Sequence, residues 1–225
     1  MPDNVAELQS TGAWQFFQDM LRDMTTVVFD LGGVVVFWDP VPAVATVVGQ
    51  ARAEQFVHGG EFDFGAWNET QDAGRPWTDA EAAATASHPH LAEEIAAYRP
   101  NFAFSLRGLV PGTAEILNAL HDSGVRLVAL TNWSAETIHY LPEVFPEVFA
   151  VFDDVVVSGA EGVAKPDPEI FQILARRLGH PIEGVFYVDD SIRNVDAART
   201  AGMDAVHFTD AAHLLTELQE RALID

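Results

Sequence analysis

An unbroken apolar run that ends in a carboxylate constrains the fold of this chain more than any other feature. Residues 25–36 read TTVVFDLGGVVV, so a β-branched segment leads directly into Asp30 and two glycines follow. A strand that is apolar on both faces is typical of the middle of a parallel sheet with helices on both sides. In such sheets ligands bind beyond the carboxyl ends of the strands, which is where Asp30 would stand.

The glycines after Asp30 admit two interpretations. Gly32 and Gly33 let the backbone turn sharply beside whatever Asp30 holds, which would indicate a binding site. Alternatively, Asp30 only ends a strand, because an aspartate followed by glycine is common in turns. The remaining strands of the chain are needed to separate the two.

Alternation of apolar and amphipathic segments resumes after Pro111 and predicts four further strands. These cover residues 125–130, 155–157, 185–188 and 205–208. Helices are expected over 113–122, from 135 onward, over 168–178 with Asp167 as N-cap, and over 194–201, and residues 158–162 are predicted to be a glycine-rich loop. Five strands that alternate with helices predict an α/β fold with a doubly wound parallel sheet.

The segment between the first strand and this alternating region has a different character. From residue 38 to about residue 108 it is alanine-rich and interrupted by prolines and glycines. Stretches typical of helices occur at 41–48, 51–57, 79–87 and 91–99, with no convincing strand among them. The predicted organisation is an N-terminal extension at 1–24, a core formed by 25–37 and 109–225, and a small all-helical cap inserted at 38–108.

Net charge and composition exclude several classes of function. The formal charge of −22 argues against nucleic acid and anionic membranes as partners, since neither would meet a basic surface. Cysteine is absent, which excludes disulfides, thiolate catalysis and zinc–thiolate sites. No apolar run approaches the length of a membrane span, and residues 1–24 lack the basic start of a signal peptide. We expect a cytoplasmic protein whose first 24 residues form a short helix or a poorly ordered extension.

Polar side chains stand at the ends of the predicted strands or in the turn after one of them. In chain order they are Asp30, Thr131, Asn132, Lys165, Asp189 and Asp190. Because the carboxyl ends of parallel strands meet at one edge of a sheet, these groups should converge. Converging carboxylates need a cation, and oxygen ligands suit Mg²⁺, while a hydroxyl, an amide and an ammonium can bind phosphate oxygens. A carboxylate aimed into such a pocket can attack phosphorus and form an aspartyl-phosphate.

Lys165 is the only lysine in the chain, and every other fixed positive side chain is an arginine. A composition that avoids lysine elsewhere but keeps it here indicates that arginine would not serve at this position. A compact ammonium fits between two carboxylates where a planar guanidinium would not. This favours a role in the site over the alternative, a chance surface lysine before a helix.

These segments resemble the four motifs of the haloacid dehalogenase superfamily. They read VVFDLGGV around Asp30, ALTN around Thr131, KPDP at Lys165 and FYVDDSIRN around Asp189, in the superfamily's order across residues 25–209. The resemblance implies a Rossmann-like core with a helical cap inserted after the first strand. Within the superfamily the chain is most similar to bacterial sugar-1-phosphate phosphatases and to the phosphatase domain of soluble epoxide hydrolases.

The resemblance implies how these residues handle a phosphate group. Asp30 would be the nucleophile, and Lys165 would bridge it to Asp189. Thr131 and Asn132 would donate hydrogen bonds to phosphate oxygens, with Gly33 beside the bound group. The chain would then be a phosphatase for a small phosphorylated metabolite, such as a sugar phosphate, and a monomer or weak homodimer.

The resemblance also implies Mg²⁺ as the cofactor. Asp30, Asp190 and the backbone carbonyl of Gly32 would hold the ion. Asp189 would keep the lysine in place, and Asn194 would hold the aspartates in position without contacting the substrate.

One position departs from the superfamily's usual pattern. Most of its phosphatases carry a second aspartate two residues after the nucleophile, which protonates the leaving group, and this chain has Gly32 there. Asp39, or Glu61 in the cap, is a candidate for the missing acid. Two alternatives to an active phosphatase follow: a weakly active or inactive phosphate-binding or regulatory module and, third, a 2-haloacid dehalogenase. The pair Asp189 and Asp190 favours phosphate chemistry over the dehalogenase.

The predicted cap contains aromatic side chains that could face a substrate. Phe62, Phe64, Trp67 and Trp77 lie close together in the sequence, near two glycine-containing turns. A cap loop that closes over a sugar would use aromatic faces, so Phe64 and Trp67 are candidates for substrate contacts. The alternative is that these rings fill the core of a small helical domain.

Overall fold

The apolar segments predicted as strands form one five-stranded parallel sheet. In the computed structural model, which describes residues 25–224, the strands are β1 (Thr26–Phe29), β4 (Arg126–Thr131), β5 (Asp154–Val157), β6 (Phe186–Asp189) and β7 (Asp204–His207). Their order across the sheet is β5-β4-β1-β6-β7, so β1 lies in the middle and the chain winds outward in both directions. The predicted doubly wound parallel sheet is confirmed.

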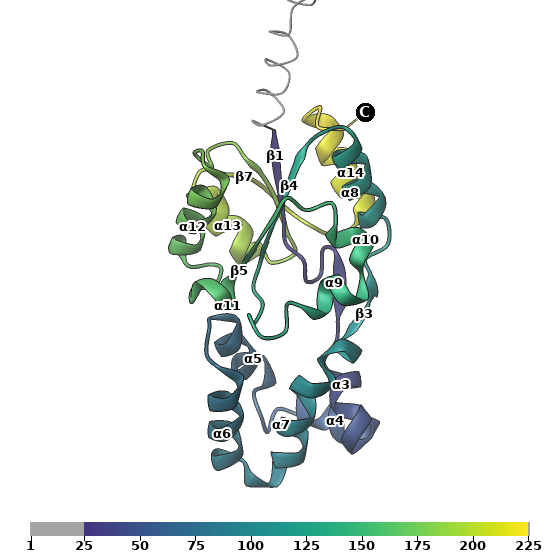
Figure 1. The fold of residues 1–225 in the computed structure, drawn as a ribbon, viewed down its shortest axis with the longest axis vertical. Coiled ribbons are helices and arrows are strands. Elements are labelled where there is room, and N and C mark those ends of the chain that lie inside the picture. Colours follow the sequence, from purple (N-terminus) through teal and green to yellow (C-terminus); the bar gives the residue numbers. More distant parts are fainter. Residues whose placement is uncertain (1–24, 225) are drawn as a thin grey trace, which may run out of the picture.

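Helices cover both faces of this sheet (Figure 1). On one face lie α8 (Thr113–Asp122) and α14 (Ala211–Glu220), and on the other lie α12 (Pro168–Leu178) and α13 (Ile192–Thr200). Val27 and Phe29 of β1 belong to the first core and Val28 to the second, and all three are fully buried. Each such apolar side chain contributes about 1.5–3 kcal/mol on burial. This double covering is why the strand reads as a continuous apolar run.

The ends of α12 follow the predicted signals. The Asp167 side chain accepts a hydrogen bond from the Glu169 N–H, and Pro168 occupies the first helical position. Gly179 ends the helix in a left-handed conformation with φ of 77°. Helix α13 begins at Ile192, two residues before the predicted start.

Two predictions for the connections were wrong. Residues from 135 onward form turns followed by two short helices, α9 (Tyr140–Val144) and α10 (Pro146–Phe149), because proline lacks the N–H that would continue the first helix into the second. The predicted loop at 158–162 contains a one-turn helix, α11 (Ser158–Glu161), which Gly162 ends with φ of 76°.

The cap lies beyond the carboxyl ends of the sheet strands (Figure 1). Its helices are α3 (Val41–Val48), α4 (Gln50–His58), α5 (Phe64–Asp72), α6 (Trp77–Ser87) and α7 (Ala92–Tyr98), with short 3₁₀ segments η1 (Pro89–Leu91) and η2 (Arg99–Ser105). The sequence did not predict α5 as a helix.

Two antiparallel strands connect the cap to the core. They are β2 (Val36–Trp38) and β3 (Leu106–Leu109), and they pair with a register shift at Phe37 and Trp38. The prediction that residues 38–108 contain no strand was therefore wrong at both ends of that range. The strands are only three and four residues long and one contains Gly108, so neither carries a recognisable strand pattern.

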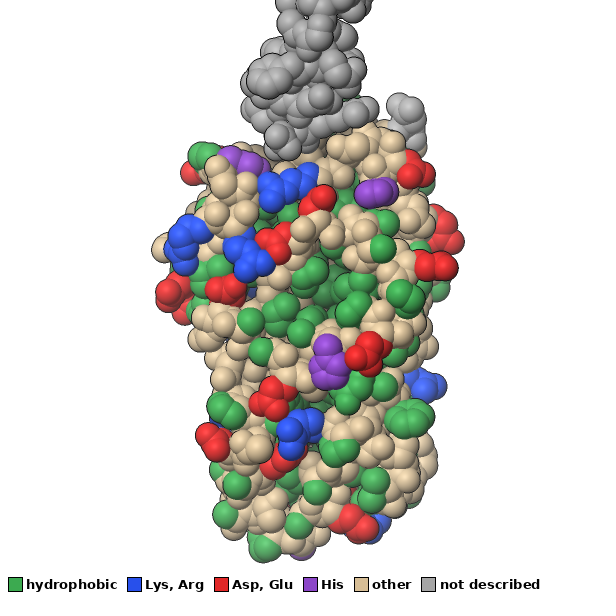
Figure 2. Space-filling model, viewed as in Figure 1, with side chains coloured by type: hydrophobic (Ala, Val, Ile, Leu, Met, Phe, Trp, Pro, Cys, Tyr) green, Lys and Arg blue, Asp and Glu red, His purple; other side chains and the backbone are tan. Residues whose placement is uncertain are grey.

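The surface agrees with the strongly acidic composition. On the face shown in Figure 2, basic side chains are few and acidic ones lie close to them. Within residues 25–224 no helix is both long and apolar enough to cross a bilayer. The predicted extension at 1–24 lies outside the described residues.

Candidate active site

The parallel strands bring the predicted polar residues to one edge of the sheet. Asp30 follows β1, Thr131 ends β4, Asp189 ends β6, and Lys165 stands in the turn before α12. All four are less than a tenth exposed. The main chain at Asp30 is fixed by its N–H, which donates to the carbonyl of Val188 in β6 at 2.8 Å. Groups that are far apart in the sequence are therefore held by the sheet itself.

The ammonium group of Lys165 has three acceptors. Its Nζ lies 3.0 Å from Asp30 Oδ1, 2.8 Å from Asp189 Oδ2 and 2.8 Å from the carbonyl oxygen of Leu130. An ammonium has three N–H donors, so each has a partner. Burial lowers the pKa of Lys165, but the charges of Asp30 and Asp189 outweigh it and leave the pKa raised. The lysine therefore stays charged between the two carboxylates.

The carboxylate of Asp189 is fully buried and surrounded by donors. Besides Lys165, it accepts hydrogen bonds from the Tyr187 hydroxyl, the Ser191 N–H at 2.8 Å and the Asn194 amide at 3.1 Å. These contacts occupy both of its oxygens, so Asp189 is suited to hold Lys165 in place and has little capacity left for another ligand. Asn194 lies directly against it.

Asn132 lines the pocket described below, but its side chain is engaged with the main chain of Lys165. Its Nδ2 donates to the Lys165 carbonyl and its Oδ1 accepts from the Lys165 N–H. The amide thus fixes the main chain of the lysine, and its second N–H can still donate to a phosphate oxygen, so the role expected from the sequence stays a prediction. Thr131 is buried at the end of β4 beside it and does not line the pocket.

Three carboxylates gather near the lysine. Oxygen atoms of Asp30, Asp189 and Asp190 lie within 4.8 Å of one another. Burial raises the pKa of Asp30 to about 7, with Asp189 and Asp190 adding to the effect and Lys165 opposing it. Burial and the charge of Asp189 likewise raise the pKa of Asp190. A single ammonium does not compensate this group, and oxygen donors suit the hard cation Mg²⁺, so the donor set fits such an ion.

Gly33 is required for this arrangement. Its φ is +73°, and a Cβ atom there would lie 2.1 Å from Oδ2 of Asp190. Glycine therefore lets Asp190 approach the backbone of the loop that follows Asp30. Gly32 is different, since a Cβ atom there would lie at an ordinary 3.8 Å from the Trp133 ring. The space beside Asp30 that a side chain at position 32 would use is open.

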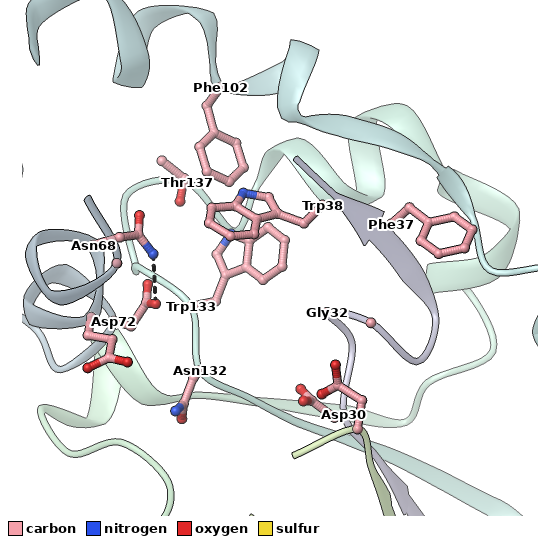
Figure 3. Close-up of a pocket in the computed structure, with 14 residues that line it drawn as sticks. Asp30, Gly32, Phe37, Trp38, Asn68, Asp72, Phe102, Asn132, Trp133 and Thr137 are labelled. Atoms are coloured by element: carbon pink, nitrogen blue, oxygen red, sulfur yellow. Dashed lines mark hydrogen bonds between the residues drawn. The ribbon is translucent and has the colours of Figure 1, made fainter. Parts of the chain in front are cut away.

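A pocket of about 480 Å³ lies between the edge of the sheet and the cap (Figure 3). Asp30, Gly32, Gly33 and Asp190 lie at its sheet end. Aromatic rings of Phe37, Trp38, Phe102 and Trp133 form one part of its wall, and Gly65, Asn68, Glu69 and Asp72 of α5 form another, with Asn132 and Thr137 completing it. The pocket thus combines a charged floor, an aromatic wall and a polar wall.

The two cap residues predicted to contact substrate do not line this pocket. Phe64 and Trp67 are buried in an aromatic core within the cap, where Phe64 packs edge-on against Tyr98 and Trp67 against Trp77. The Trp67 Nε1 donates to the carbonyl of Ala80 at 3.3 Å. The structure therefore places these rings where the alternative interpretation expected them.

Sequence reasoning missed the pocket residues of α5. Positions 64, 67 and 71 are buried in the cap, whereas 65, 68, 69 and 72 face the pocket. This is the spacing of the two faces of one helix. Recognising the aromatic pair as i and i+3 of a helix would have directed attention to Asn68 and Asp72.

Neither residue proposed as a substitute acid is found in the pocket. Glu61 is exposed and pairs with His90 at 2.8 Å. Asp39 accepts a hydrogen bond at 3.0 Å from the N–H of Val41, the first residue of α3. The carboxyl of Asp72, which no sequence motif marks, does line it.

Comparisons with known proteins agree with this site. A sequence model of the family described as haloacid dehalogenase-like hydrolase matches residues 24–202. The sesquiterpene phosphatase astK of Aspergillus oryzae is 26% identical over 209 residues, which cover 89% of this chain and 98% of that protein. The phosphoglycolate phosphatase of Salmonella typhimurium is 29% identical over 214 residues, which cover 85% of this chain and 83% of that protein.

The fold also has solved counterparts. A HAD family enzyme from Bacteroides thetaiotaomicron, solved in complex with magnesium and inorganic phosphate, matches with a TM-score of 0.66 at 18% sequence identity. The match covers 84% of this chain and 98% of that one. At this identity the likeness establishes the fold alone.

Proposed function

This chain belongs to the haloacid dehalogenase-like hydrolases and is a phosphoric monoester hydrolase, and we propose that it cleaves a small phosphorylated metabolite through an aspartyl-phosphate on Asp30. The observation that carries the mechanism is the position of Asp30. Its carboxylate opens into the pocket while Lys165, braced by Asp189, holds one of its oxygens. The other oxygen is free of that contact and is the candidate nucleophile.

Mg²⁺ is the cofactor, and Asp30, Asp190 and the carbonyl oxygen of Gly32 are the residues that would hold it. The chemistry it supplies when bound is neutralisation of the negative charge on the phosphate and on the carboxylates. The convergence of three carboxylates around one ammonium supports this assignment. It is further supported by the Bacteroides thetaiotaomicron enzyme, whose structure contains magnesium and phosphate.

The chain's own residues perform the remaining tasks in this mechanism. Lys165 orients Asp30 for attack and offsets the charge that accumulates on the oxygens around phosphorus. Asp30 forms the new oxygen–phosphorus bond as the bond to the leaving oxygen breaks. Water then attacks the aspartyl-phosphate, which releases inorganic phosphate and restores the Asp30 carboxylate.

The residues of the pocket walls indicate which organic group the substrate could carry. A sugar phosphate is one candidate, because an aromatic face opposite amide and carboxyl groups, here Asn68 and Asp72, is a common way to bind a polyhydroxylated ring.

A phosphate ester of a hydrocarbon alcohol is the second candidate substrate class. Phe37, Trp38, Phe102 and Trp133 offer an apolar surface that a hydrocarbon chain could contact. The similar protein from Aspergillus oryzae is a sesquiterpene phosphatase, which supports testing this class beside sugar phosphates.

The test is release of inorganic phosphate from a panel of monoesters, with and without Mg²⁺ and after EDTA treatment. The panel contains sugar-1-phosphates, sugar-6-phosphates, phosphoglycolate, farnesyl monophosphate and p-nitrophenyl phosphate. We expect Mg²⁺-dependent turnover of at least one ester and none with Asp30→Asn, which keeps the shape of the side chain. Binding of phosphate without turnover would instead favour the regulatory module, and metal-independent release of halide from a 2-haloacid would favour the dehalogenase.

The cytoplasmic location and the monomeric or weakly dimeric state stay predictions.

A further inference from the structure

A carboxyl group of the cap faces the same pocket as the nucleophile. Asp72 is the last residue of α5 and is half-buried, and Figure 3 shows it on the cap side of the pocket with Asp30 on the opposite side. No side chain at position 32 is present to protonate a leaving group, because that residue is glycine. Asp72 therefore lies on the side of the pocket that the leaving group would occupy when its phosphorus faces Asp30.

Contacts with the core fix the end of α5. The Ser158 hydroxyl donates to the carbonyl oxygen of Asp72 and accepts from the Trp133 N–H at 3.0 Å, so it joins the cap to the loop after β4. Gly74 lies so close to the core that a Cβ atom on it would be 3.0 Å from the Cα of Gly162. These contacts involve the main chain, so the position of Asp72 does not depend on its own carboxyl.

A third contact joins the cap to the same core loop. The Nε1 of Trp77, the first residue of α6, donates to the Ser134 hydroxyl at 2.8 Å, and both side chains are buried. The Trp77 N–H also donates to Glu136 at 2.9 Å. The structure thus represents the cap docked on the core with Asp72 held over the site.

The surroundings of the Asp72 carboxyl favour its protonated form. Burial raises the pKa of Asp72 to about 7, and the neighbouring charge of Glu69 adds to the effect. Hydrogen bonds from the Ser134 N–H and from Asn68 Nδ2, which lies 3.0 Å from Oδ2, oppose it. A carboxyl with a pKa near the working pH can both give and take a proton. Glu69 also lines the pocket but is exposed, whereas Asp72 is half-buried.

We propose that Asp72 is the general acid for the leaving oxygen, supplied by the cap in place of a side chain at position 32. This role rests on the phosphatase function proposed above. As Asp30 forms its bond to phosphorus and the bond to the leaving oxygen breaks, that oxygen takes the proton of Asp72 and departs as an alcohol. In the second half, the Asp72 carboxylate takes a proton from the attacking water, whose oxygen bonds to phosphorus. Inorganic phosphate leaves, and both aspartates return to their starting states.

The test compares kcat/KM of wild type and Asp72→Asn across phosphate monoesters of graded leaving-group pKa, from p-nitrophenyl phosphate through phenyl phosphate to an alkyl phosphate. This ratio reports the steps up to the first irreversible one, so it isolates departure of the leaving group from hydrolysis of the intermediate. A positioned acid typically contributes about 10²–10⁴-fold. We expect a loss of that size on the alkyl ester and a change of only a few-fold on p-nitrophenyl phosphate. A plot of log kcat/KM against leaving-group pKa should therefore be steeper in the variant.

Two further variants make the test specific. Asp79→Asn is the matched control, because Asp79 is an exposed carboxylate of the same cap outside the pocket, and its slope should equal that of wild type. Gly32→Asp added to Asp72→Asn should restore alkyl ester hydrolysis at least in part, since the space beside Gly32 is open. Circular dichroism and Mg²⁺ affinity confirm that each variant is folded, and Asp72→Ala provides a second neutral variant judged on the same slope.

The outcomes separate this role from the function on which it rests. An equal loss on all esters, or an unchanged slope, in an otherwise active enzyme would overturn the role of Asp72 and leave the phosphatase intact. If the wild type hydrolyses no monoester with Mg²⁺, the phosphatase proposal fails and the role of Asp72 fails with it.

Discussion

Asn132 and Lys165 exchange two hydrogen bonds that join the end of β4 to the turn before α12. The Asn132 Nδ2 lies 2.9 Å from the Lys165 carbonyl oxygen, and the Lys165 nitrogen lies 2.8 Å from Asn132 Oδ1. The side-chain amide thereby imitates the pairing of a neighbouring strand. Only asparagine, or glutamine with a longer stem, presents a donor and an acceptor in this geometry.

Asn132→Asp should therefore impair catalysis. The new carboxylate cannot donate to the Lys165 carbonyl and would face its oxygen, which would shift the lysine away from Asp30. Each lost hydrogen bond typically costs about 0.5–1.5 kcal/mol. We expect kcat/KM to fall at least tenfold and Tm to fall by several degrees. Asn101→Asp, which also loses an amide donor to a backbone carbonyl but lies in the cap outside the pocket, is the control and should keep wild-type kcat/KM.

Gly33→Ala should weaken Mg²⁺ binding. A methyl group at this position would overlap Asp190, and the backbone φ of +73° is unfavourable for alanine. Asp190 would be displaced from the other carboxylates, and we expect the Mg²⁺ dissociation constant, measured by calorimetry, to rise at least tenfold. Gly65→Ala, where a Cβ atom meets its nearest neighbour at 3.7 Å, should bind Mg²⁺ as wild type does. Equal affinities in all three proteins would place the ion elsewhere.

Trp67→Ala and Trp38→Ala should affect different properties. Trp67 lies in the aromatic core of the cap, and removing such a side chain typically costs about 3–5 kcal/mol. Its loss should lower Tm by roughly 2–4 °C per kcal/mol. Trp38 lines the pocket and is 37% exposed, so its replacement should mainly raise KM for the best substrate of the panel. An increase in KM with unchanged Tm for Trp67→Ala would show instead that Trp67 contacts substrate, as the sequence predicted.

The proposed acid also makes a prediction for pH dependence. Because the pKa of Asp72 is raised to about 7, its acid form is lost above that pH, and kcat/KM for an alkyl ester should decline there. Asp72→Asn should remove this decline, while p-nitrophenyl phosphate should show little of it even in wild type. Glu69 on the same helix, and Asp30 and Asp190 across the pocket, are the other charged groups that face Asp72, so only the difference between wild type and variant is diagnostic.

The raised pKa of Asp72 also determines how the stability of the protein should change with pH. The folded state holds the Asp72 proton more tightly than the unfolded state, whose pKa is near the model-compound value of 3.8. Its contribution to stability is therefore present below that pH and lost as the pH rises to about 7. The Tm of Asp72→Asn minus that of wild type should therefore be more positive at pH 8 than at pH 4. The opposite trend would mean that folding lowers the pKa of Asp72 instead of raising it.

The parts of the fold that could be predicted are strands and helix ends that neighbouring residues mark clearly in the sequence. The continuous apolar run of β1 predicted a strand that is buried on both faces of a parallel sheet. The aspartates after β1 and at the end of β6 then identified the carboxyl edge of that sheet. In α12, Asp167 and Gly179 marked both helix ends because each satisfies backbone groups locally. These features are set by residues adjacent in sequence.

The parts that could not be predicted depend on contacts between distant segments. The strands β2 and β3 are stable only because residues about 70 positions apart pair with each other. Asp72 enters the pocket only because Ser158, Trp77 and Gly74 dock α5 on the core. The pairing of the Asn132 side chain with the main chain of Lys165 was not predicted, because no local pattern records it.

The burial of Lys165 has a practical consequence for chemical labelling. It is the chain's only lysine, and its side chain is fully inaccessible between Asp30 and Asp189. An amine-acylating reagent would therefore find no reactive ε-amino group while the core is folded. Modification at position 165, read by mass spectrometry, would count the molecules whose active site has opened. The chain thus contains its own single-residue reporter of local unfolding, and ligands that close the site should slow the labelling of that residue.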